Sequence, residues 1–65
     1  MTNYINSEII KIIDDRIHSE RDRDILKRRL IDGLSYDELS NEFHLSSRQI
    51  KNIVYKKQEI IFKHL

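Results

Sequence analysis

The stretch Leu34–Tyr55, LSYDELSNEFHLSSRQIKNIVY, decides the fold of this chain. It contains two serines that are each followed, three residues later, by a side chain able to reach back: Ser35 with Glu38, and Ser46 with Gln49. In such a capping box the serine hydroxyl accepts from a free backbone amide at a helix start, and the later side chain accepts from the serine's own amide. Two capped starts so close together predict a short helix, a tight turn and a second helix.

His44 lies where the chain must turn between these helices. A residue with positive φ is usually needed there; glycine is preferred, and histidine tolerates that region better than β-branched residues do. Apolar or small residues have the spacing that lets two short helices cross steeply and share a core, namely Leu39, Ser40, Phe43, Leu45, Ile50 and Ile53. We therefore expect a helix-turn-helix, with helices over about 36–43 and 47–62.

Two further helices are expected before this unit. The first, over about 7–17, follows from isoleucines at helical spacing, at Ile9, Ile10, Ile13 and Ile17. The second, over about 20–32, has Ser19 as its N-cap, with Asp22 in an imperfect capping-box position. Gly33, the single glycine, should end that helix because it adopts a left-handed conformation without a Cβ penalty. The expected fold class is all-α, a small four-helix domain containing a helix-turn-helix, with the whole chain as one domain.

The length and composition of the chain argue against several classes of function. A chain of 65 residues buries only about 60% of its unfolded surface, which leaves little room for an enclosed catalytic cavity, so we expect no enzyme. There is no cysteine for a disulfide or a thiolate zinc site, and His18, His44 and His64 are scattered. We therefore expect neither a metal nor another cofactor. The first residues lack the basic start and long apolar run of a signal peptide, so the expected location is cytoplasmic.

Positive charge is concentrated near the last helix. Residues 1–42 carry seven Lys/Arg against ten Asp/Glu, whereas residues 43–65 carry five against Glu59 alone. On a helical projection one side of this helix holds Ile50, Ile53, Val54, Lys57 and Ile61, and one arc of the other side holds Arg48, Lys51, Asn52 and Tyr55. Arginine, lysine and asparagine supply donors suited to base edges and phosphate oxygens. This arc predicts contact with duplex DNA, and an ordinary solvated helix face is the alternative.

The segment Arg21–Lys56 resembles region 4 of the sigma-70 family of bacterial transcription initiation factors, and more distantly the C-terminal DNA-binding domain of LuxR/GerE-type regulators. The resemblance is carried by RDRDIL, GLSYDEL and LSSRQIKNI in that order. It implies that the last helix enters the major groove of a promoter element, with base contacts from Arg48, Lys51 and Asn52. The full set of candidate DNA-binding residues is Ser46, Ser47, Arg48, Lys51, Asn52, Tyr55 and Lys56.

The chain departs from that family at three positions. His44 replaces the usual turn glycine, Ser40 replaces the small apolar residue where the helices cross, and Arg28 stands where an apolar side chain is common. From these 65 residues we expect no counterpart of the sigma regions that grip the polymerase core. We therefore expect a stand-alone regulator from a phage or mobile element, or a small accessory subunit. The rival hypothesis is a protein-interaction module that binds RNA polymerase or another regulator, with weak or no DNA binding.

Two surface features leave alternatives open. The basic side chains of the second helix either touch phosphates or form ion pairs within that helix with interleaved acids; they are Arg21, Arg23, Lys27, Arg28 and Arg29. The C-terminal EIIFKHL extends the apolar side of the last helix through Ile60, Ile61 and Leu65, with Phe62 toward the opposite side. This tail either folds over Ile9, Ile10 and Ile13 or pairs with another molecule. We expect a monomer with the tail packed on the first helix; a homodimer through the C-terminal helix is the alternative.

Overall fold

The computed structural model describes residues 6–64. It contains four helices: α1 (Asn6–Arg16), α2 (Glu20–Leu30), α3 (Tyr36–Phe43) and α4 (Ser47–Lys63). No strand occurs within this range, so the expected all-α class with four helices is confirmed. The bounds of α3 are as expected, and those of α1 and α4 differ from expectation by one residue.

The expected end of α2 at residue 32 is wrong, because the helix ends at Leu30. The amides of Ile31 and Asp32 both donate to the carbonyl of Lys27, at 2.9 and 3.4 Å, so the regular helical pairing stops there. Gly33 follows with φ of 76°, the left-handed conformation expected from the sequence.

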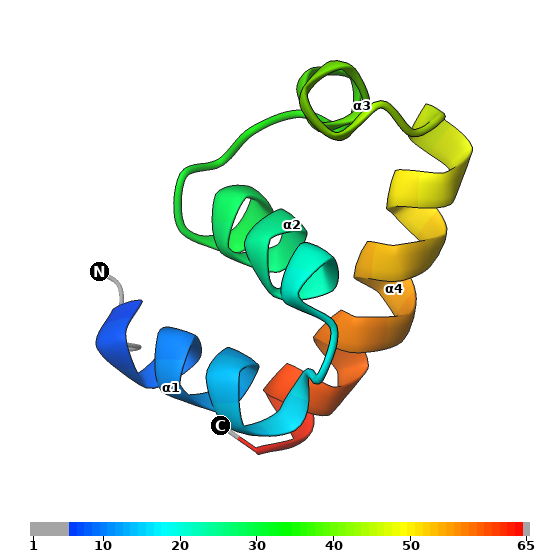
Figure 1. Ribbon diagram of the computed structural model, residues 1–65. Helices are drawn as coiled ribbons and strands as arrows, with labels where there is room; N and C mark the ends of the chain where they lie inside the picture. Colours follow the sequence, from blue (N-terminus) through cyan, green and yellow to red (C-terminus); the bar gives the residue numbers. More distant parts are fainter. Residues whose placement is uncertain (1–5, 65) are drawn as a thin grey trace.

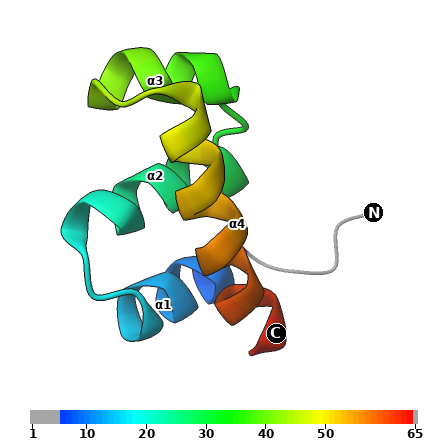
Figure 2. The same ribbon diagram turned by 90° about the vertical axis from the view of Figure 1, so that its right-hand side faces the viewer.

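The four helices surround two hydrophobic clusters. α4 runs along one side of the molecule, from α3 at one end to α1 at the other, and α2 lies between these ends against α4 (Figures 1 and 2). One cluster is built on Ile25, Leu39, Ile50 and Val54, and the other on Ile13, Ile17, Leu26 and Ile61. Ile25 and Leu26 are neighbours in α2, yet each belongs to a different cluster. α2 is therefore the shared wall that holds the α3–α4 end to the α1 end.

The end of α4 completes the second cluster. Ile61 is fully buried, and Ile60 packs against the same cluster, as Ile9 does from α1. This confirms that the apolar tail folds over the first helix. The expected contact with Ile10 is wrong in detail, because Ile12 packs against the cluster instead, while Ile10 is half-buried outside it. Phe62 is 54% exposed on the opposite side, and Leu65 lies outside the described residues.

Of the five basic side chains of α2, two pair with acids of other helices and Arg21 alone pairs within α2, with Asp22. Lys27 Nζ lies 2.9 Å from Asp14 Oδ1 on α1, and Arg28 Nε lies 2.9 Å from Glu42 Oε2 on α3. Arg28 therefore remains at the surface and causes no conflict with the core. Such partly exposed pairs contribute at most about 1 kcal/mol each, so they orient the helices more than they stabilise them.

Candidate nucleic-acid interface

The start of α4 is set by local hydrogen bonds. The amide of Gln49 donates to Ser46 Oγ at 3.1 Å, and the amide of Ser46 donates to Gln49 Oε1 at 2.9 Å, which closes the box expected from the sequence. The equivalent box on α3 closes in the same way, at 3.1 and 2.8 Å between Ser35 and Glu38. Both helix starts are thus determined by residues within one turn of each other.

The turn between α3 and α4 is also held locally. His44 has φ of 57° and ψ of 38°, the left-handed conformation expected for this position. Its amide and that of Leu45 both donate to the carbonyl of Ser40, and the Ser40 hydroxyl donates to the carbonyl of Leu45. Serine therefore fits where the helices cross and adds a hydrogen bond to the turn, which an alanine would lack. The turn fixes the direction in which α4 leaves α3.

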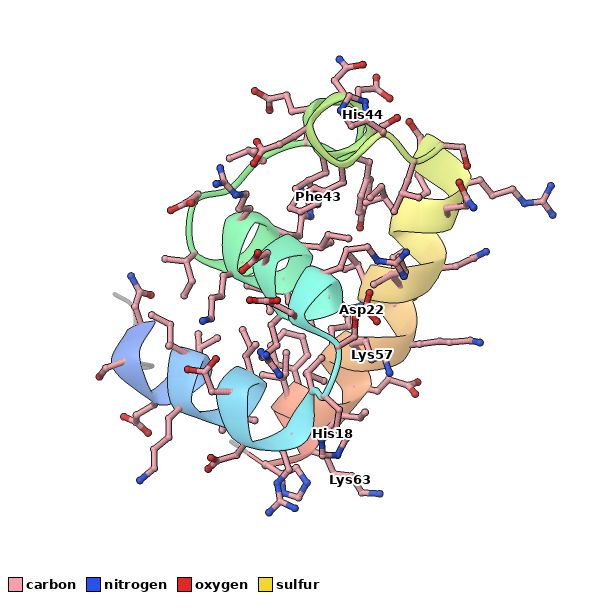
Figure 3. All side chains as sticks on the ribbon, viewed as in Figure 1. His18, Asp22, Phe43, His44, Lys57 and Lys63 are labelled. Carbon is pink, nitrogen blue, oxygen red and sulfur yellow. The ribbon has the colours of Figure 1, made fainter. Side chains whose placement is uncertain are left out.

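The outward face of α4 carries the expected polar side chains. Arg48, Lys51, Asn52, Tyr55 and Lys56 are all exposed, whereas Ile50 and Val54 on the inner side are fully buried. Figure 3 shows side chains that end in nitrogen projecting outward from this helix. The division of α4 into an inner apolar and an outer polar face follows the helical projection.

The two serines at the start of α4 already have partners within the protein. The Ser46 hydroxyl caps the helix, and the Ser47 hydroxyl donates to Asp37 Oδ1 on α3 at 2.7 Å. Asp37 therefore places a carboxylate beside the candidate DNA-binding residues, a feature that the sequence analysis missed. The negative charge of this carboxylate repels a phosphate, and its oxygens accept hydrogen bonds only.

A cluster of two tyrosines and two cations borders α4 on the side of α3. The rings of Tyr36 and Tyr55 meet edge to face, with centroids 6.2 Å apart and planes at 85°. The Arg29 guanidinium lies 4.3 Å from the Tyr36 centroid, and Lys51 Nζ lies 5.6 Å from it. Arg29 also donates to the carbonyl of Leu34 at 2.8 Å, so the cation is anchored to the loop before α3. The cluster holds Tyr55 and Lys51 in place at the edge of the outer face.

The electrostatics of the cluster follow from these contacts. A hydrogen bond with Tyr36 raises the pKa of Tyr55, the charge interaction with Tyr36 and desolvation add to the rise, and the nearby Arg29 opposes it. Tyr55 is therefore a neutral donor and acceptor at neutral pH. Sequence reasoning placed Tyr55 on the outer face but missed Arg29 and Tyr36 as its neighbours, because they come from other elements.

On the opposite edge α4 borders a shallow, open depression of about 240 Å³. Its lining residues are Arg21, Leu45, Gln49, Asn52 and Ile53. The outer face of α4 therefore lies between two flanks that carry guanidinium groups, Arg21 on one side and Arg29 on the other. The exposed candidates Arg48, Lys51, Asn52, Tyr55 and Lys56 lie on the outer face of α4, whereas Ser46 caps the helix start and Ser47 is half-buried against Asp37. The two flanking arginines come from α2.

Side chains that could bind a metal are scattered within residues 6–64. No three side chains of histidine, cysteine, aspartate or glutamate gather there in a way that would hold a metal ion. His18 and His44 lie at opposite ends of the molecule (Figure 3). None of the described helices combines the length and the apolar character needed to cross a membrane.

Comparison of the chain with protein-family models, with curated proteins and with solved structures finds no match.

Proposed function

We propose that this protein is a sequence-specific regulator of transcription that binds duplex DNA through a unit resembling sigma region 4. In this proposal α3 and α4 form a helix-turn-helix, and α4 enters the major groove. The protein acts in the cytoplasm, where bacterial promoter DNA is found.

The observation that carries the proposal is a contrast between paired and unpaired cations. On α2, Lys27 and Arg28 each lie within ion-pair distance of a carboxylate on another helix, and Arg23 and Arg29 donate to backbone carbonyls. On the outer face of α4, Arg48, Lys51 and Lys56 form no ion pair with any acid in the described part of the chain. A helix that leaves its cations unpaired and exposed, beside the amide of Asn52, suits a polyanion with hydrogen-bonding base edges.

The roles of the side chains follow from their chemistry. Arg48 suits the O6 and N7 acceptors of guanine, Asn52 suits the N6 and N7 of adenine, and Lys51 suits either guanine or a phosphate oxygen. Lys56 lies on the same face one turn further along α4 and is assigned to a phosphate. The hydroxyl of Tyr55 adds a neutral contact at the edge of this surface.

A second candidate function rests on a different observation. Phe62 is 54% exposed at the far end of α4, and Tyr55 is 53% exposed on the same helix. Exposed aromatic side chains on a small domain with a net charge of only +1 suit a protein partner, and RNA polymerase or another regulator is the partner that the resemblance suggests. In this alternative, DNA binding is weak or absent.

The decisive experiment is a fluorescence anisotropy titration on duplexes selected from a random library, at two salt concentrations. The variant Arg48→Ala/Lys51→Ala should lose roughly 1 to 3 kcal/mol of specific binding for each bidentate base contact removed. The matched control is Lys11→Ala/Arg16→Ala, which removes the same charge from exposed positions of α1. Equal losses in both variants, or no duplex binding by the parent protein, would overturn the proposal. Absence of duplex binding together with a stable complex with purified RNA polymerase would favour the alternative.

A further inference from the structure

We infer that Asp22 is a positioning residue that holds the Arg21 guanidinium over the depression beside α4, where it binds a backbone phosphate of duplex DNA. This inference rests on the proposed function and assigns a phosphate contact to α2, outside the recognition surface of α4.

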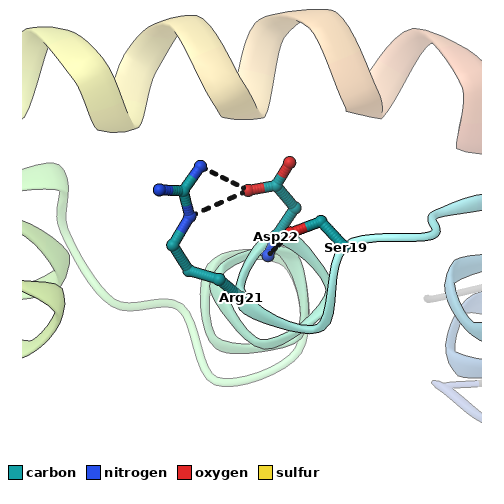
Figure 4. A network of polar contacts seen from close by, with 3 residues as sticks. All are labelled: Ser19, Arg21 and Asp22. Atoms are coloured by element: carbon teal, nitrogen blue, oxygen red, sulfur yellow. Dashed lines mark hydrogen bonds and ion pairs between the residues drawn. The ribbon is translucent and has the colours of Figure 1, made fainter.

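The first observation is a capping box that stays open. In α3 and α4 the residue three positions after the capping serine returns a hydrogen bond to the serine amide. At the start of α2 the amide of Asp22 donates to Ser19 Oγ at 3.3 Å, but the Asp22 carboxylate instead accepts from Arg21 (Figure 4). The carboxylate is therefore free from capping and is used to hold an arginine.

The second observation is the burial of that carboxylate. The side chain of Asp22 is only 10% exposed, whereas that of Arg21 is 54% exposed. Burying a carboxylate is costly unless it is hydrogen-bonded and paired. Within residues 6–64, Arg21 is the one cation at ion-pair distance from it. Asp22 is therefore the buried member of this ion pair, and Arg21 is the member that faces solvent.

The geometry leaves the guanidinium able to bind a second anion. Arg21 Nε and Nη2 both donate to the same oxygen, Asp22 Oδ1, at 3.2 Å. A guanidinium has five N–H groups, so those not directed at Asp22 remain for an oxyanion such as phosphate. Asp22 restricts the rotation of the arginine side chain before any ligand arrives, which lowers the entropy lost on binding.

The surroundings of Arg21 favour a phosphate at this position. The depression that it lines is shared with Gln49 and Asn52 of α4. Gln49 uses its side-chain oxygen in the capping box, so its amide N–H groups are the atoms left to donate. The Arg21 guanidinium and the Gln49 amide are hydrogen-bond donors suited to phosphate oxygens. Because Asn52 also belongs to the proposed recognition surface, this phosphate would lie next to the bases that α4 reads.

The test asks whether removing the negative charge of Asp22 strengthens or weakens binding to DNA. Asp22→Asn raises the net charge of the protein by one, so general electrostatics predicts tighter binding to DNA. If Asp22 positions Arg21, the same variant should instead bind a selected duplex roughly three- to tenfold more weakly. Asp24→Asn is the matched control, because Asp24 is an exposed acid on the same helix without an ion pair among the described residues. It should bind as the parent does or more tightly.

A double-mutant cycle shows whether Asp22 acts through Arg21. Arg21→Gln should weaken binding and flatten the dependence of log affinity on log salt by about 0.9, the amount for one lost phosphate contact. In the Arg21→Gln background, Asp22→Asn should no longer weaken binding. Arg21→Lys keeps the charge at an exposed position but loses the planar fork, so it should also bind more weakly than the parent. Tighter binding by Asp22→Asn, or losses that simply add in the double variant, would overturn the inference.

Two further outcomes separate this inference from its alternatives. If the parent protein binds no duplex, both proposals fail; if it binds and Arg21→Gln leaves affinity and salt slope unchanged, only this inference fails. Thermal melts in inorganic phosphate and in chloride at equal ionic strength test the free anion as the ligand. Phosphate could raise the melting temperature of the parent protein but not that of Arg21→Gln, while both proteins bind the duplex equally. That result would assign the depression to a free anion and overturn the DNA contact.

Discussion

Truncation of Ile61 to alanine tests whether the end of α4 belongs to the core. Ile61 is fully buried against Ile13, Ile17 and Leu26, so its removal leaves a cavity between α1, α2 and α4. Large-to-small substitutions at fully buried sites cost about 2–5 kcal/mol, and the lower part of that range applies where neighbours can move inward. Ile61 lies near the end of α4 and packs on α1, away from the centre of the fold, so we assign this site to the lower part of the range. The expected loss in the free energy of unfolding is therefore about 2 to 3 kcal/mol.

This loss is large for so short a chain. At about 0.05–0.15 kcal/mol per residue, a domain of this length has a total stability of roughly 3–10 kcal/mol. The substitution should lower the melting temperature by roughly 10 °C or more. Urea titration followed by far-ultraviolet circular dichroism measures the change, and an unchanged m-value would show that the same surface is exposed on unfolding.

The neighbouring residue supplies the control. Phe62 is 54% exposed, so Phe62→Ala should change stability by no more than about 0.5 kcal/mol. Because we expect a monomer, the melting temperature of the parent protein should not depend on protein concentration. A neutral Ile61→Ala, or a Phe62→Ala that costs more than Ile61→Ala, would refute the assignment of the tail to the core. A concentration-dependent transition that Phe62→Ala abolishes would instead indicate a dimer through α4.

Three further predictions concern the turn, the α3 cap and the basic face of α4. His44→Gly should be neutral or stabilising in thermal melts, whereas His44→Val should destabilise by about 1–2 kcal/mol because a β-branched side chain resists φ of 57°; a valine variant as stable as the glycine variant would contradict this. Hydrogen bonds from the backbone amide of Ser35 and then from its hydroxyl lower the pKa of Glu38 below the ordinary value of 4.5. The stability that this cap contributes is therefore present above pH 4.5 and is lost as the pH falls through the lowered pKa. Glu38→Gln should remove that part of the pH dependence, and an acid melting profile unchanged by this substitution would count against the cap. Lys56→Gln should flatten the salt dependence of DNA affinity by up to about 0.9, and Lys57→Gln by less because Lys57 is half-buried; an unchanged slope in both would place the phosphate contacts elsewhere.

The sequence by itself determined the features that depend on residues within about one helical turn of each other. The capping boxes at Ser35 and Ser46, the left-handed His44 and the left-handed Gly33 all follow from local hydrogen bonds and backbone sterics. The inner and outer faces of α4 follow from its helical period, because residues three or four positions apart lie on the same side of any α-helix. For this reason the exposed candidate residues could be placed on one surface from the sequence alone.

Only the tertiary structure decided which side chains meet from different elements. The pairing of Ser47 with Asp37 and the stacking of Arg29 on Tyr36 depend on how α2, α3 and α4 cross, which no local pattern encodes. The pairing of Lys27 with Asp14 likewise depends on how α1 packs against α2. Tertiary packing also decides how the side chains of Arg21 and Asp22 lie, although the two residues are adjacent in the chain. A capping residue normally turns back to its own helix, and Asp22 is instead buried beside the depression that Arg21 lines with α4.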